Sequence, residues 1–143
     1  MTNENSSDTI LGVDALLNNT NLGNNTAIGY RALRLNGDGF QNTSVGAYAL
    51  EKNIKTHNNT GLGYKALSES VGEYNTGVGA LCGETLKTGI KNVLVGKHAD
   101  VSKLNADNQI VIGQGATGLL DNSVTLGNVN VNNVFMSQDK TAH

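Results

Sequence analysis

A repeated pentad, Asn-Thr-x-aliphatic-Gly, is the feature of this 143-residue sequence that most restricts its fold. Full copies begin at Asn25, Asn42, Asn59 and Asn75, and the related pentads DTILG, NVLVG, QIVIG and SVTLG extend the array in both directions. They bring eight glycines into one register: Gly12, Gly29, Gly46, Gly63, Gly79, Gly96, Gly113 and Gly127. The spacings are 17, 17, 17, 16, 17, 17 and 14 residues, too short for two packed helices per repeat. The chain is therefore expected to stack small units.

Each unit contains an alternating pattern that is typical of a short β-strand. An aliphatic residue such as Ile28 stands directly before the glycine, and a β-branched residue such as Thr26 stands two positions earlier. Side chains alternate along a strand, so both columns should share one face, and we expect that face to point inward. The glycines are expected to form a corner, and the asparagines to close each turn through bonds to the backbone.

The composition indicates a thin core and gives no support for binding to nucleic acid or insertion into a membrane. Hydrophobic residues make up 38% of the chain and aromatic residues 4%, with 18 glycines and no proline. A single narrow solenoid would bury little per residue, so three parallel chains sharing an axis are expected to cover further columns. The net charge is -2 and no basic stretch or long apolar run occurs, so neither nucleic-acid binding nor membrane insertion is expected.

These patterns predict an all-β parallel β-solenoid or β-roll of about eight coils of 14–17 residues. We expect a flexible segment at residues 1–7, the repeat domain at residues 8–131, and a cap, neck start or tail at residues 132–143. Cys82 occupies a column that otherwise holds alanine, three residues after each glycine, and is expected to point inward. No metal site and no cofactor are predicted.

The columns Asn-Thr-x-Ile/Val-Gly-x-x-Ala-Leu and the closing run NQIVIGQGATGLLDNSVTLGN support a family resemblance. They resemble the left-handed parallel β-roll of trimeric autotransporter adhesin heads of the YadA type, and the related repeats of phage and algal-virus tail fibres. The resemblance covers nearly the whole chain. It implies a homotrimeric rod on a virion or cell surface that contributes to host attachment. The last spacing of 14 matches the adhesin-head coil, whereas the coils of 17 imply a longer outer loop.

Two surfaces are candidates for contact with a cell-surface glycan or protein receptor. Aromatic and basic residues follow several of the glycines, and such side chains suit carbohydrate as well as chain-to-chain contacts. The loops at residues 36–40 and 51–57 vary between units without disturbing the stack. The sequence leaves the choice between these surfaces and roles open. The residues after the glycines are Tyr30, Arg31, Tyr48, Tyr64 and Lys65.

Two other functions fit the sequence less well. A monomeric ice-binding β-solenoid would use the threonine column, but it needs threonines that face outward, and we expect this column to face inward. An enzyme would need catalytic groups in neighbouring coils. The histidines and carboxylates are scattered through the units, and the sequence therefore favours a non-enzymatic protein. These residues are His57, His98, His143, Asp38, Glu51, Glu69 and Glu84.

Overall fold

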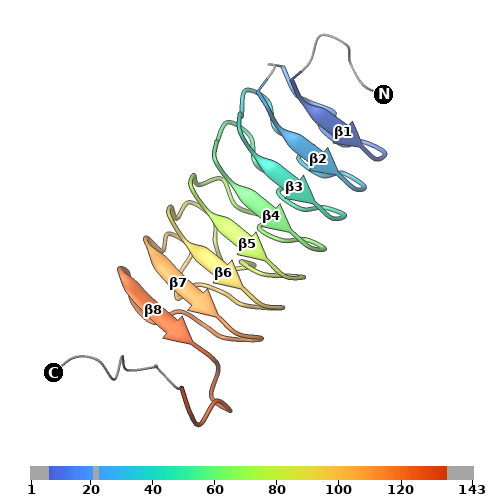
Figure 1. The fold of residues 1–143 in the computed structure, drawn as a ribbon. Helices are drawn as coiled ribbons and strands as arrows, with labels where there is room; N and C mark the ends of the chain where they lie inside the picture. Colours follow the sequence, from blue (N-terminus) through green and yellow to red (C-terminus); the bar gives the residue numbers. More distant parts are fainter. Residues whose placement is uncertain (1–6, 21–22, 135–143) are drawn as a thin grey trace, which may run out of the picture.

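The computed structural model describes residues 7–20 and 23–134, which form one stack of short parallel strands (Figure 1). All eight strands belong to one sheet, in the order of the sequence. The chain makes about seven turns of about 17 residues each, which confirms the predicted parallel β-solenoid. The strands are β1 (Thr9–Leu11), β2 (Thr26–Ile28), β3 (Thr43–Val45), β4 (Thr60–Leu62), β5 (Thr76–Val78), β6 (Val93–Val95), β7 (Gln109–Ile112) and β8 (Ser123–Leu126).

Two of the expected segments fall largely outside the described residues. Of the segment 1–7, the structure describes only Ser7, and of the segment 132–143 only residues 132–134, which contain no strand.

In the described part of the chain, no helix is long and apolar enough to cross a membrane.

Equivalent positions of successive coils pair directly with one another. Thr26 pairs with Thr43 and Thr43 with Thr60 across parallel strands. The corners continue the same ladder, because the Gly46 N–H donates to the Ile28 carbonyl at 2.8 Å. Hydrogen bonds between coils therefore run through strands and corners alike, and they fix the register that the glycine spacing indicates.

The prediction that the threonine and aliphatic columns form the core is wrong. In β2, the middle residue Ala27 is buried, whereas Thr26 and Ile28 on either side are only partly buried. The strands from β3 to β6 repeat this pattern of a buried middle residue between two more exposed neighbours. The two columns do share one face, as predicted, but that face is the outside of the sheet.

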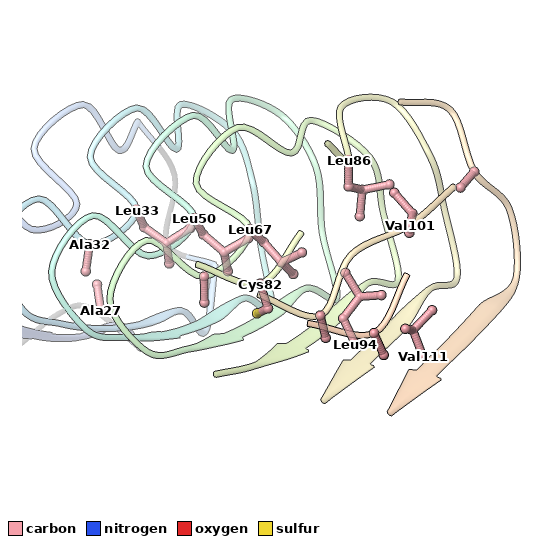
Figure 2. Close-up of a cluster of buried hydrophobic side chains, with 14 of the residues drawn as sticks. Ala27, Ala32, Leu33, Leu50, Leu67, Cys82, Leu86, Leu94, Val101 and Val111 are labelled. Atoms are coloured by element: carbon pink, nitrogen blue, oxygen red, sulfur yellow. The ribbon is translucent and has the colours of Figure 1, made fainter. Parts of the chain in front are cut away.

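The width of the interior explains this inversion. Leucines from the opposite wall, such as Leu50 and Leu67, fill the interior and are fully buried (Figure 2). A Cβ added at Gly61 in β4 would lie 3.0 Å from Leu50 Cγ, and one at Gly77 in β5 would lie 2.7 Å from Leu67 Cγ. Only a very small residue therefore fits in the middle of a strand that faces a leucine, because interiors are close-packed.

The side chains that fill the core change after Leu67. Up to that point a buried leucine stands four residues after each corner glycine, at Leu16, Leu33, Leu50 and Leu67. The position four residues after Gly79 is Gly83, where a Cβ would lie 3.1 Å from Leu94 Cδ1. Leu94, the middle residue of β6, is itself fully buried and takes the space that a leucine of the opposite wall occupies elsewhere (Figure 2). At this coil the large buried side chain therefore comes from the strand and the small residue from the opposite wall.

Buried asparagines join each coil to the next. The Asn59 N–H donates to Asn42 Oδ1 at 3.0 Å, and Asn59 Oδ1 accepts from the Asn75 N–H at 2.9 Å. The Asn59 side-chain amide also donates to the Gly72 carbonyl at 2.8 Å. Each side chain therefore satisfies buried backbone groups that water cannot reach. The buried column consists of Asn25, Asn42, Asn59, Asn75, Asn92 and Gln109.

Candidate interaction surface

The outward side of the sheet carries a column of aliphatic side chains and a column of threonine and aliphatic side chains along the whole stack, and we call it the outer sheet face. Its side chains are 66% exposed at Leu11, 37% at Val45 and 42% at Ile112. Seven strand spacings give it a length of roughly 34 Å. Its two columns are Thr9, Thr26, Thr43, Thr60, Thr76, Val93, Ile110 and Val124, and Leu11, Ile28, Val45, Leu62, Val78, Val95, Ile112 and Leu126. An exposed face with a continuous column of aliphatic side chains marks an interaction site more often than free surface.

The structure brings together the five contact residues predicted from the sequence. They lie on the two residues that follow each corner glycine, a strip beside the outer sheet face that we call the trailing flank. The rings of Tyr30 and Tyr48 are 5.2 Å apart at 88°, and those of Tyr48 and Tyr64 are 6.2 Å apart at 87°. The cations lie between them, with Arg31 Cζ 5.1 Å from the Tyr30 centroid and Lys65 Nζ 5.5 Å from the Tyr64 centroid.

This geometry determines what the trailing flank offers to a partner. Edge-to-face rings do not form a flat platform, and the two cations lie near the ring faces on which a sugar would stack. Arg31 is also tied within the chain, since its Nε lies 3.5 Å from Asp14 Oδ2. The flank therefore presents ring edges and positive charge.

A second aromatic ladder lies on the other side of the strands, and the sequence analysis did not identify it. It occupies the two residues before each buried Asn or Gln, which we call the leading flank. The rings of Phe40 and His57 stack at 4.4 Å and 6°, and the rings of His57 and Tyr74 meet edge to face at 5.6 Å. His57 Nδ1 also lies 3.1 Å from Glu73 Oε1. Three ring-bearing residues at intervals of 17 were the signal that could have revealed this ladder.

The two loops that were candidate contact surfaces are only partly exposed. Asn36 and Asn53 are fully buried, and the Asn53 amide donates to Asn36 Oδ1 at 2.7 Å. These asparagines form a second internal ladder, while Ile54 and Lys55 stay at the surface. Part of each loop therefore supports the stack, and only the remaining positions are available to a partner.

The residues considered for catalysis take part in contacts between coils. His98 Nδ1 lies 3.1 Å from Glu84 Oε2. Glu69 lies 2.9 Å from Lys52 Nζ and 3.2 Å from Lys87 Nζ, and the hydrogen bond from Lys52 is the main cause that lowers the pKa of the Glu69 carboxyl. Among residues 7–20 and 23–134, no three His, Cys, Asp or Glu side chains are grouped so as to hold a metal ion. His143 lies outside the described residues.

Cys82 points into the core, as predicted, and is fully buried. Desolvation raises the pKa of its thiol from 9.0 to about 11. The equivalent residues in the neighbouring coils, Ala66 and Ala99, are also buried. Alanine is therefore a matched replacement for Cys82, with the same backbone and surroundings.

The Cys82 thiol is expected to make stability depend on alkaline pH. Because the folded pKa is raised, its contribution is complete below about pH 9 and is lost as the pH rises towards 11. Between pH 8 and pH 11 the free energy of unfolding should fall by about 2 kcal/mol more in the natural protein than in Cys82→Ala. Urea unfolding of both proteins at each pH measures this difference, and parallel pH profiles would contradict it.

At the C-terminal end of the stack, a hollow of about 410 Å³ is lined by residues that include Thr117, Leu119 and Val129. Leu119 is 74% exposed and Val129 97% exposed. The hollow holds no group of titratable side chains and is a feature of the end of the solenoid.

Comparison of the chain with protein-family models, with curated proteins and with solved structures gives no match.

Proposed function

We propose that this chain is a non-enzymatic fibre or adhesin-head module that assembles into a rigid homotrimeric rod. The outer sheet face is the observation that carries this proposal. Aliphatic side chains stand partly exposed in register on consecutive strands, and covering them with another apolar face removes that surface from water. Burial of apolar area is the main favourable term in most protein association. A second and a third copy of the same chain provide such faces.

A parallel arrangement of three chains around one axis suits the shape of this face. The face is a single straight strip on each chain, so three strips meeting at an axis cover one another and close the assembly. The number three and the left-handed course of the coils are what the resemblance to YadA-type heads implies. Hydrogen bonds between all coils supply the rigidity that such a rod needs.

The rod is proposed to act on a virion or cell surface and to contribute to host attachment. With the outer sheet faces at the axis, the loop side of each chain faces outward. Exposed residues there, such as Ile54 and Lys55, remain accessible to a cell-surface glycan or protein receptor. The buried asparagines beneath them hold the loop backbone, which allows the exposed positions to differ between coils.

Small-angle X-ray scattering of the purified chain tests the proposed rod. The forward scattering should correspond to three chains, and the cross-section should be that of three solenoids side by side over roughly 34 Å of coils. A particle with the mass of one chain, or with chains joined only end to end, would contradict the proposal.

A monomeric ice-binding solenoid is a second candidate, favoured by one specific observation. The threonine column was expected to face inward, but Thr26, Thr43 and Thr60 lie in register on the outer sheet face. A flat outward row of threonines is what ice binding requires.

Thermal hysteresis of the unassembled chain tests this second candidate. Activity that is present in the natural protein and lost in Thr43→Leu would favour ice binding. Thr88→Leu provides the control, because Thr88 is an exposed threonine outside the outer sheet face. If the natural protein is a trimer and shows no thermal hysteresis, ice binding is excluded, because assembly covers the threonine row.

A further inference from the structure

The two flanks border the outer sheet face on opposite sides, and their aromatic ladders overlap at the levels of β3 and β4, with an offset of one coil. On the trailing flank, Tyr30 follows β2 and Tyr64 follows β4. On the leading flank, Phe40 precedes β3 and Tyr74 precedes β5. Both ladders therefore flank the part of the sheet between β2 and β5. The outermost rings are the most accessible, with Tyr64 47% and Tyr74 49% exposed.

The flanks also carry opposite net charge. Basic residues outnumber acidic ones on the trailing flank, whereas acidic residues outnumber basic ones on the leading flank. The trailing flank holds Arg31, Lys65 and Lys97 against Asp14, and the leading flank holds Glu73 and Asp107 against Lys91. Each flank also holds one histidine, His98 and His57 respectively. Complementary charge on two strips of one chain favours contact between copies and fixes which strips meet.

From this arrangement we propose that the trailing flank of one chain binds the leading flank of the next chain around the axis. The partner is a second copy of this chain, and the inference rests on the proposed trimer. In a ring of three, each chain meets its two neighbours through two different surfaces. Parallel chains at equal height then bring the Tyr30–Tyr64 ladder within one coil of the Phe40–Tyr74 ladder of the neighbour, so that the two ladders overlap at β3 and β4.

The contact chemistry suits an interface better than free surface. Interfaces are enriched in aromatic residues and arginine, and Arg31 and Lys65 already lie against tyrosine rings on one flank. On the other flank, the acidic residue Glu73 lies beside His57 of the second ladder. Contact between flanks would enclose the rim of the outer sheet face, so that water is excluded from the apolar columns at the axis.

Cross-linking of paired cysteines tests the proposed contact. In a Cys82→Ala background, Tyr64→Cys and Tyr74→Cys are combined and treated with a short bifunctional maleimide. The double variant should yield covalently closed trimers in a denaturing gel, whereas each single variant should stay uncross-linked, since trailing flanks do not meet each other. Within one chain the run from Asn59 to Gly63 separates the two sites by roughly 13 Å, which excludes direct pairing in the same chain.

The light-scattering mass of the same samples separates failure of this inference from failure of the trimer. A mass of three chains without cross-links in the double variant would overturn the flank contact and leave the trimer standing, with the flanks open to a glycan. Cross-links in a single variant would also overturn it, because they require like flanks to meet. A mass of one chain would overturn both proposals.

A second pair of variants checks the same contact without cysteines. Tyr64→Ser and Tyr74→Ser each remove one exposed ring and should raise the dissociation constant of the trimer at least tenfold, with unchanged circular dichroism. Leu104→Ser is the control, because Leu104 is 55% exposed and lies on neither flank. Equal and small effects of all three changes would contradict the proposal.

Discussion

Replacement of Val78 by lysine is expected to convert the proposed trimer into monomers that remain folded. Val78 lies in β5, near the middle of the outer sheet face, and points away from the core. A lysine there is tolerated by a single chain, whose side chain reaches water. In the trimer it would bring three like charges together in an apolar centre, at a cost of several kcal/mol. Light scattering should show a dissociation constant raised at least 100-fold.

Ile54→Lys is the matched control for Val78→Lys. It introduces the same charge in place of an aliphatic residue, but on the loop side, where Ile54 is 47% exposed. This variant should remain trimeric, and both variants should keep the circular dichroism spectrum of the natural protein. If Val78→Lys assembled as well as Ile54→Lys does, the outer sheet face would not be the contact between chains.

Replacement of Gly46 by alanine is expected to lower the free energy of unfolding by about 3 kcal/mol or more. Gly46 has φ +135°, a backbone conformation that other residues rarely adopt. A Cβ there would also lie 2.5 Å from the carbonyl oxygen of Gly63 in the next coil. The coils would have to separate at a point where the ladder of hydrogen bonds is continuous. Urea unfolding of the variant measures the loss.

Gly115→Ala separates backbone strain from the close approach of coils. Gly115 has φ +62° but no atom within 4 Å of an added Cβ. Only the left-handed conformation is then penalised, and the expected loss is about 1 kcal/mol. Similar losses for the two variants would show that the corner glycines are required for their φ angle alone, contrary to the packing seen at Gly46.

The stacking register could be predicted from the sequence because hydrogen bonding between coils requires equivalent residues at equal intervals. The recurrence of the Asn-Thr-x-aliphatic-Gly pentad fixed the strand positions, and the burial of Leu33 and Ala49 follows from columns that are visible in the sequence. The clustering of Tyr30, Tyr48 and Tyr64 was accessible in the same way, because the periodicity places residues after successive glycines side by side.

The direction in which the strands face could not be obtained from alternation alone. Alternation shows that Thr26 and Ile28 share a face, but it does not say which side of the sheet is inside. The decisive information is volume: Gly61 and Gly77 are small because Leu50 and Leu67 occupy the space in front of them. We expected aliphatic residues to lie in the core of a single chain, and this expectation placed the two columns on the wrong side of the sheet.

The contacts within the flanks depend on side-chain geometry that periodicity does not encode. The interval of 17 residues places Phe40, His57 and Tyr74 close together, but stacking at 6° for one pair and a near-perpendicular contact for the other follow from local packing. The same holds for Arg31 and Lys65, whose positions over tyrosine rings limit what the trailing flank can bind.

In the proposed rod, two further copies of the chain cover the outer sheet face. The most direct test is the solution mass of the natural protein, measured by light scattering over a range of concentrations. The proposed trimer has a mass of about 45 kDa, which is three times the 14.9 kDa of one chain, and this mass should persist on dilution. A mass of one chain at all concentrations would contradict it and would leave the threonine row exposed, with ice binding as the function to test next.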